Sequence, residues 1–445
     1  MPGSADAQPG PAGVLVRGNR SFRSYWAGEA TSLAGSSLHA VALPVVAVLE
    51  LNATPSQVSL LAAAAMTPAF VLALPAGVVG DRYAKKPVMV GTDLAAAAVV
   101  ASVPACWAVG MLSVPVLYAV ALLLGALTVL HQAASIAIVP ELVEREKLPA
   151  ANSRIAAAYS VADTSGTYGG TFVVGLAGAV HALWLDSVSY IFSAWCALQV
   201  RPVTPPKPTA SHHARMIDAI REGVGFVMRD PLQRPLVLAL TCHAYADGIV
   251  TTYFAYTLLT ELDAGSTGLG LVMGVSGAGG LVGALAAPRL VARLGPGRVL
   301  LTGFLGYPAC GVPLLLAQPE PAWLAGLAVA GAVRTAAAAA AGSTQRSIRQ
   351  QQCPAHLQAR AQQTSVWLVS GLRPFAALTA GSIAAVFGVW ASLLVGTVLY
   401  LVPAALLWAS PIRHLAKMPG PPTDPPPPPA ACRQPTPTED DHHVH

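Results

Sequence analysis

Long apolar segments recur along almost the whole chain, and each is long enough to cross a lipid bilayer as a helix. A spanning helix needs about 20 mostly apolar residues. Twelve segments qualify: 22–50, 56–80, 87–111, 114–139, 151–180, 182–200, 235–260, 266–292, 298–317, 321–345, 360–387 and 389–410. Only 11% of the 445 residues are charged, whereas soluble proteins carry about 25%. The sequence therefore predicts an all-α membrane protein with twelve transmembrane helices.

The twelve segments form two sets of six, separated by one long polar stretch. This stretch, 201–234, opens with several prolines and continues with a basic amphipathic segment. We expect a disordered cytoplasmic N-terminus (1–21), a six-helix bundle (22–200), a cytoplasmic linker (201–234), a second six-helix bundle (235–412) and a disordered Pro-rich tail (413–445). Pseudo-symmetric six-helix repeats with a site between them, near the membrane midplane, are a known plan of transporters.

The loops between the predicted helices differ in charge on the two sides of the membrane. If the N-terminus is cytoplasmic, the inside loops are rich in Arg and Lys, while the outside loops contain neither. Positive residues accumulate in cytoplasmic loops. The pattern therefore predicts a multi-pass protein of a bacterial cytoplasmic (inner) membrane, with both termini in the cytoplasm.

Sequence motifs of several other protein classes are absent. The chain has no Gly-x4-Gly-Lys-Ser/Thr loop, which argues against a built-in ATPase, and no HExxH or GxSxG motif of an enzyme. Its six cysteines show no CxxC spacing and indicate neither a disulfide framework nor a metal site. We expect no enzymatic activity, no cofactor, no metal and no nucleic-acid partner, so an ion gradient must drive any active transport.

Ionisable residues inside the predicted spans are candidate functional positions, because a charge in the bilayer core is costly. Arg334 lies near the centre of the tenth span and needs a carboxylate, an anionic ligand or water as a partner. Asp163 and Asp247 lie at comparable depth. We expect Arg334 and at least one of them to line a central cavity, where the carboxylate exchanges a proton for substrate. The alternative is a permanent structural ion pair.

Further ionisable residues lie at other depths. Four of them complete the set of proton-coupling or cavity candidates: Glu29, His39, His131 and His243. His243 shares a helix face with Asp247, while His39 and His131 are equally compatible with hydrogen-bonded packing. We interpret Asp93 as a structural partner of the nearby basic loop and Asp186 as a helix-end residue.

The strongest local motif connects the second and third segments. Its distinguishing residues are Gly77, Gly80, Asp81, Arg82, Lys85 and Lys86. This pattern resembles the loop signature of the major facilitator superfamily, with Ala84 where that family usually has Gly. The resemblance implies that Asp81 contacts the N-terminal end of helix 11 and helps to hold a cytoplasmic gate closed, as suits a carboxylate at a helix N-terminus. The alternative is a simple topogenic turn.

Other short motifs are similar to the third drug–proton antiporter branch of this superfamily, which includes macrolide-efflux and enterobactin-exporter-like proteins. They include Phe22–Gly28, Ser32–Gly35, Pro140–Val143, Ser189–Ile191 and Pro231–Leu232. The resemblance covers about residues 20 to 415 and implies the major facilitator fold and export of an amphiphilic molecule in exchange for protons.

The chain also departs from the antiporter pattern. Gly166-Thr167 replaces Gly-Pro in helix 5, Ser36 replaces an acidic residue, and the fourth span contains no arginine. Gly166 and Gly170 are four residues apart, so they leave one flat helix face for close packing.

The leading function predicted from the sequence is export of a drug, antibiotic or other natural product, driven by a proton gradient. A siderophore exporter and an uptake permease or facilitator on the same fold are the alternatives, because a fold does not fix a function. A membrane-embedded enzyme and a non-transporting receptor fit less well. We expect a monomer in the lipid bilayer whose two bundles rock around a midplane site that binds a small molecule.

Overall fold

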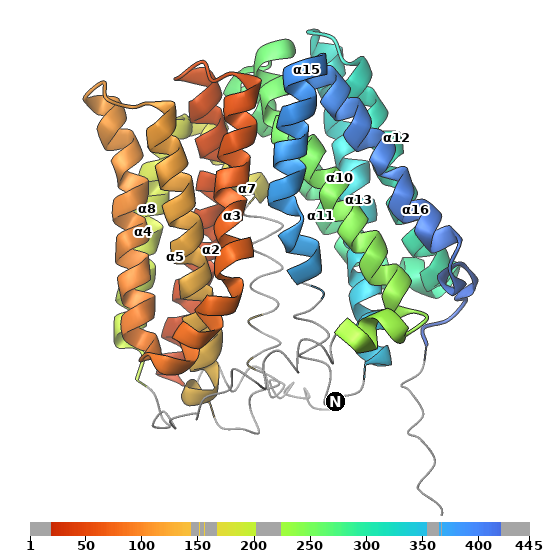
Figure 1. Ribbon diagram of the computed structural model, residues 1–445, viewed down its shortest axis with the longest axis horizontal. Coiled ribbons are helices and arrows are strands. Elements are labelled where there is room, and N and C mark those ends of the chain that lie inside the picture. Colours follow the sequence, from red (N-terminus) through yellow and green to blue (C-terminus); the bar gives the residue numbers. More distant parts are fainter. Residues whose placement is uncertain are drawn as a thin grey trace, which may run out of the picture.

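The computed structural model describes residues 19–143, 151, 155, 167–201, 224–353, 365 and 367–419, with only the backbone described for 73–82, 167–169, 171 and 350. The helices of the first half are α2 (Arg20–Leu49), α3 (Pro55–Arg82), α4 (Lys85–Ala108), α5 (Val114–Leu142), α7 (Thr167–Ala177) and α8 (Ala179–Gln199). Those of the second half are α10 (Gln233–Tyr256), the π-helix η3 (Thr257–Glu261), α11 (Gly265–Leu294), α12 (Pro296–Leu316), α13 (Pro321–Gln352), α15 (Arg373–Leu399), α16 (Leu401–Trp408) and the 3-10 helix η4 (Pro411–His414). The two groups stand side by side (Figure 1).

Local side-chain chemistry accounts for several helix ends. The Asn19 side chain accepts a hydrogen bond from the Phe22 backbone N–H at 3.0 Å and caps α2. The Thr54 N–H donates to Gln57 Oε1 at 2.8 Å just before α3. Gly388 has a φ of +84°, which glycine adopts without steric cost. Its non-helical backbone divides α15 at the position predicted for the loop between the last two spans.

Helix lengths agree with a membrane protein. Eight candidate spans in the described part of the chain are long and apolar enough to cross a membrane, and one of them, 367–408, runs through the break at Gly388. Helices α8 and α10, with 21 and 24 residues, are not among these eight, and α7 has 11 described residues. The predicted all-α membrane fold is confirmed, and a total of twelve spans is consistent with these elements.

Helix α8 shows how the bundle faces lipid. The side chains of Trp184, Val188, Ile191 and Trp195 are about half exposed and follow one face at helical spacing. The opposite face is buried and partly polar, with Asp186, Ser187, Tyr190 and Ser193. Apolar side chains outside and polar side chains inside reverse the pattern of a soluble helix, as expected where the surrounding solvent is lipid.

The two halves contact each other in a symmetric way. Helix α3 packs against α15, and α7 packs against α11. The second helix of each half therefore meets the fifth helix of the other half. The Tyr253 hydroxyl also donates a 3.0 Å hydrogen bond across the halves to the Pro55 carbonyl oxygen. This hydrogen bond lies at the end where α3 begins, which is opposite the end where α2 begins (Figure 1).

Gly170 on α7 allows close approach to α2, because a β-carbon at this position would lie 3.1 Å from the Ser37 carbonyl oxygen. We expect Gly170→Leu to lower the yield of monodisperse protein several-fold, since overpacking a tight contact typically costs about 1–3 kcal/mol. Size-exclusion chromatography and thermal unfolding measure the effect. The matched control is Gly91→Leu on α4, where a β-carbon would meet nothing within 4 Å. Equal losses for both variants would contradict a packing role. Gly166 lies outside the described residues.

Candidate functional site

A cavity of about 640 Å³ lies between the two halves. Its walls come from α2, α3 and α5 on one side and from α10, α11, α12, α13 and Tyr400 on the other. Most of the lining is apolar, including Leu43, Leu61, Leu124, Phe254, Met273 and Leu327. Polar lining residues include His39, Gln132, Thr251, Arg334 and Tyr400. A mostly apolar cavity of this size with a few polar groups is typical of a small-molecule site.

A charged pair lies at the cavity wall formed by the second half. Arg334 Nη1 on α13 is 3.7 Å from Asp247 Oδ1 on α10, and both side chains are about one quarter exposed, at 24% and 23%. The Tyr400 hydroxyl donates a 2.9 Å hydrogen bond to the same carboxylate oxygen. The Arg334 guanidinium also lies 5.8 Å from the centre of the Tyr307 ring. Asp163, the other carboxylate considered for Arg334, lies outside the described residues.

His243 packs as an aromatic ring behind this pair. Its ring centre is 4.1 Å from that of Tyr307 and 5.4 Å from those of Phe304 and Tyr400. Its Nδ1 atom is buried without a hydrogen-bond partner among the described residues. Because an imidazolium ion would need acceptors for both N–H groups, this environment favours the neutral ring.

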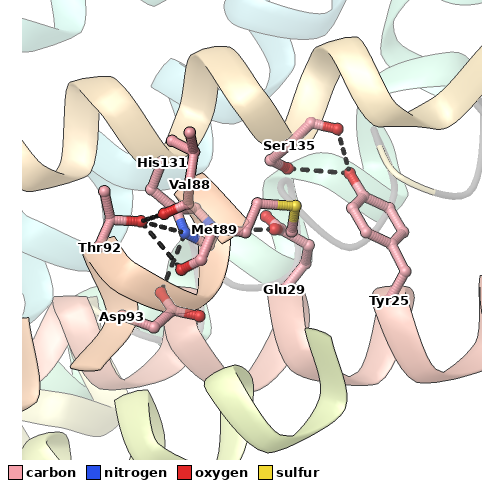
Figure 2. A network of polar contacts seen from close by, with 8 residues as sticks. All are labelled: Tyr25, Glu29, Val88, Met89, Thr92, Asp93, His131 and Ser135. Carbon is pink, nitrogen blue, oxygen red and sulfur yellow. Dashed lines mark hydrogen bonds and ion pairs between the residues drawn. The ribbon is translucent and has the colours of Figure 1, made fainter. Parts of the chain in front are cut away.

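A second polar cluster lies inside the first half, where His131 on α5 is held between two carboxylates (Figure 2). His131 Nε2 is 2.9 Å from Glu29 Oε1 on α2, and His131 Nδ1 is 3.0 Å from Asp93 Oδ1 on α4. Thr92 Oγ1 lies 3.3 Å from Nδ1. Both carboxylate side chains are almost fully buried, at 6% and 1% exposure. The His131 ring separates the two carboxylates, and within the described ranges no three His, Cys, Asp or Glu residues are arranged to hold a metal ion.

A second histidine–carboxylate pair joins α2 to α8. His39 Nδ1 is 2.8 Å from Asp186 Oδ2, and the Asp186 side chain is fully buried. The Ser189 hydroxyl donates to the Asp186 backbone oxygen at 2.8 Å, and the His39 ring stacks on Tyr190 with ring centres 6.4 Å apart. Asp186 thus fixes the orientation of an imidazole that lines the central cavity.

Two interpretations from the sequence were wrong. Asp93 pairs with His131, and the two described lysines of the basic loop, Lys85 and Lys86, bind other groups. Asp186 is no ordinary helix-end residue, because it is fully buried and paired with His39. In both cases the partner comes from a helix distant in sequence, so local spacing carried no signal for the pair. Tyr400 and Tyr307 were also missed, since a tyrosine in an apolar segment is indistinguishable from a packing residue.

The motif between the second and third spans is described only in part. Gly77, Gly80, Asp81 and Arg82 lie at the end of α3, but their side chains are outside the described part, as is the predicted contact of Asp81. The next two basic residues are tied to the first half. Lys85 Nζ is 3.1 Å from Glu141 Oε1, and Lys86 Nζ donates to the Leu198 and Val200 carbonyl oxygens at 2.6 and 3.0 Å.

Comparison with known proteins agrees with this architecture. A major facilitator family model described as "Transmembrane secretion effector" matches residues 17–433. Multidrug efflux pump Tap of Mycobacterium tuberculosis is 28% identical over 309 residues, which cover 67% of this chain and 73% of that protein. The uncharacterized transporter YfiS of Bacillus subtilis is 25% identical over 331 residues, 71% of this chain and 73% of its own. The nucleoside transporter NupG shares the fold, with a TM-score of 0.67 at 13% identity over 88% of this chain and 98% of its own.

Proposed function

Because the chain belongs to the transmembrane secretion effector family of major facilitator transporters, we propose that it exports amphiphilic small molecules from the cytoplasm in exchange for protons. The central cavity is the observation that carries this proposal. Its walls are mostly apolar and come from both halves, so that an amphiphilic compound finds apolar surface together with a few polar groups. The similarity to a multidrug efflux pump supports the same substrate class.

In this proposal the polar residues at the cavity have separate roles. Arg334 contacts polar or anionic groups of the substrate. Asp247, whose carboxylate accepts a hydrogen bond from Tyr400, holds the guanidinium in place. His39, oriented by Asp186, offers a polar contact from the opposite wall. His243 supports Tyr307 and Tyr400 by ring packing. A buried ionisable group beside a transport path is a functional candidate by default.

Transport by this proposal follows alternating access, in which residues 22–200 rock against residues 235–412 around the central cavity. The protein sits as a monomer in the cytoplasmic membrane of a bacterium with both termini inside, and the segment from Gly77 to Lys86 belongs to its cytoplasmic gate. A proton gradient supplies the energy, and no bound cofactor takes part. Asp163 is a further candidate for the cavity wall.

Filling the cavity tests the proposal. We expect Ala40→Trp, which places an indole in the cavity lining, to lower export of transported drugs at least about ten-fold, since the indole occupies space that the substrate needs. The measurement is drug accumulation in cells that express the protein. The control is Val188→Trp on α8, where the side chain is 60% exposed on the outer face. Unchanged export by a well-expressed Ala40→Trp protein would exclude this cavity as the path, and drug uptake in place of export would identify a permease.

A further inference from the structure

The hydrogen bonds around His131 account for two protons in its cluster. The Thr92 hydroxyl donates to the carbonyl oxygens of Val88 and Met89 at 2.8 and 2.9 Å, so its oxygen faces His131 Nδ1 as an acceptor. Nδ1 therefore carries a hydrogen, directed at Thr92 and Asp93. A second proton lies between Nε2 and Glu29 Oε1, whose separation is 2.9 Å. If both protons lie on the His131 ring, one imidazolium and two carboxylates give a net charge of −1. If the second proton lies on Glu29, the ring is neutral, Asp93 alone is ionised, and the net charge is again −1.

This negative charge is poorly compensated. Asp93 Oδ2 is buried and has no hydrogen-bond partner among the described residues, and no described lysine or arginine forms an ion pair with Glu29 or Asp93. Other titratable groups on the surrounding helices have partners of their own: Lys85 pairs with Glu141, Lys86 donates to backbone oxygens, and His39 pairs with Asp186. The Tyr25 hydroxyl donates to the Ser135 carbonyl oxygen, and Tyr190 lines the same small cavity as the cluster. Burial disfavours a net charge, and one more proton would remove it.

The cluster also adjoins the transport path. Glu29, Asp93 and His131 line a small cavity of about 70 Å³, which is large enough to hold water. Ser36, Thr128 and Gln132 line both this small cavity and the central cavity. Polar side chains thus form the boundary between the cluster and the central cavity.

Asp247 offers a contrast. Its carboxylate already has the cation of Arg334 at 3.7 Å and a hydrogen bond from Tyr400 at 2.9 Å. Both partners stabilise the ionised form. A group stabilised in this way is a poor site for a proton that must bind and leave in every cycle.

We propose that Glu29, His131 and Asp93 together form the binding site for the exchanged proton, with Asp247 remaining ionised. Uptake of one proton from the outer side takes the cluster from a charge of −1 to 0, and release to the cytoplasm restores −1. This assignment rests on the proposed proton-coupled export but is tested separately from it.

The first test observes the proton itself, without any substrate. We compare infrared difference spectra of the purified protein in lipid between about pH 6 and 9, where exposed carboxyl groups with ordinary pKa values near 4 stay ionised. The difference spectrum of the wild type is expected to show the C=O stretch of a carboxylic acid that is protonated at the lower pH. Glu29→Gln and Asp93→Asn each replace a carboxylate by an amide, whose oxygen still accepts a hydrogen bond from His131. With both protons on the His131 ring, the cluster of either variant then has no net charge. Both variants should lose the band, whereas Glu50→Gln, at an exposed residue beside Trp107, should keep it. A wild type without the band, or a band unchanged in both variants, overturns the proposal.

The second test measures coupling in inside-out vesicles supplied with amphiphilic drugs. Glu29→Gln and Asp93→Asn should lower drug-driven proton movement at least ten-fold while exchange of labelled drug across the membrane continues. Proton movement at the wild-type level in either folded variant overturns the proposal and leaves proton-coupled export intact. If the wild type itself moves no protons with any drug, the proposed function fails, and the infrared band alone decides whether the cluster binds a proton.

Discussion

A disulfide between cysteines placed at Ser59 and Gly381 is expected to stop transport almost completely. Ser59 lies on α3 and Gly381 on α15, and a β-carbon at 381 would lie 2.9 Å from that of Ser59. A disulfide needs about 3.5–4.5 Å between its β-carbons, so a small helix shift is enough to form it. Alternating access requires the two halves to separate at this end, and we therefore expect drug flux to fall at least about 20-fold on oxidation and to recover on reduction.

The cross-linking experiment needs a chain in which the six native cysteines are replaced. The Ser59→Cys and Gly381→Cys single variants serve as controls, and oxidation should leave their flux unchanged. Mass spectrometry reports the fraction of cross-linked protein. Wild-type flux in a fully cross-linked sample would contradict rocking of the two halves about the central cavity.

Removal of Arg334 has the second large effect. In Arg334→Met the Asp247 carboxylate loses its cation and keeps the hydrogen bond from Tyr400. We expect drug flux to fall about 100-fold, since the guanidinium faces the cavity, and the free energy of unfolding to fall by about 1–3 kcal/mol. The lower part of this range applies because both side chains are about one quarter exposed. Thermal unfolding in detergent and drug flux in vesicles are the measurements.

The double variant Asp247→Asn/Arg334→Met separates binding from stability. It removes both charges, so it should regain most of the lost stability while transport stays low. If the double variant transports like the wild type, the ion pair is only structural. If the double variant is no more stable than Arg334→Met, then the loss of stability in Arg334→Met does not come from the unpaired Asp247 carboxylate.

Much of the fold could be predicted from the sequence, because the bilayer imposes simple rules. Apolar length and loop charge located the helices, and even the reversal at Gly388 coincides with the predicted loop. The expected depth of Asp247 and Arg334 agrees with their separation of 3.7 Å. The depth of a residue in the membrane follows from its position along its span, so it can be predicted from the sequence.

Lateral position was harder to predict. Asp93 and His131 are 38 residues apart in sequence, and their contact depends on how α4 and α5 rotate about their own axes. In helices rich in Ala and Gly, large apolar and polar residues do not alternate with a clear helical period. The sequence therefore does not indicate which face of each helix points inward. Asp186 was misjudged for the same reason, since its depth near a helix end concealed the buried pair with His39.

Drug-driven proton movement in inside-out vesicles with an acidic lumen tests proton-coupled export most directly. A panel of amphiphilic drugs and siderophores is added outside while the lumenal pH is recorded. Proton-coupled export predicts that particular compounds cause loss of lumenal protons with the wild type and Val188→Trp, but not with Ala40→Trp. Drug flux that is insensitive to uncouplers, without proton loss for any compound, would contradict it and indicate a facilitator or a transporter coupled to another ion.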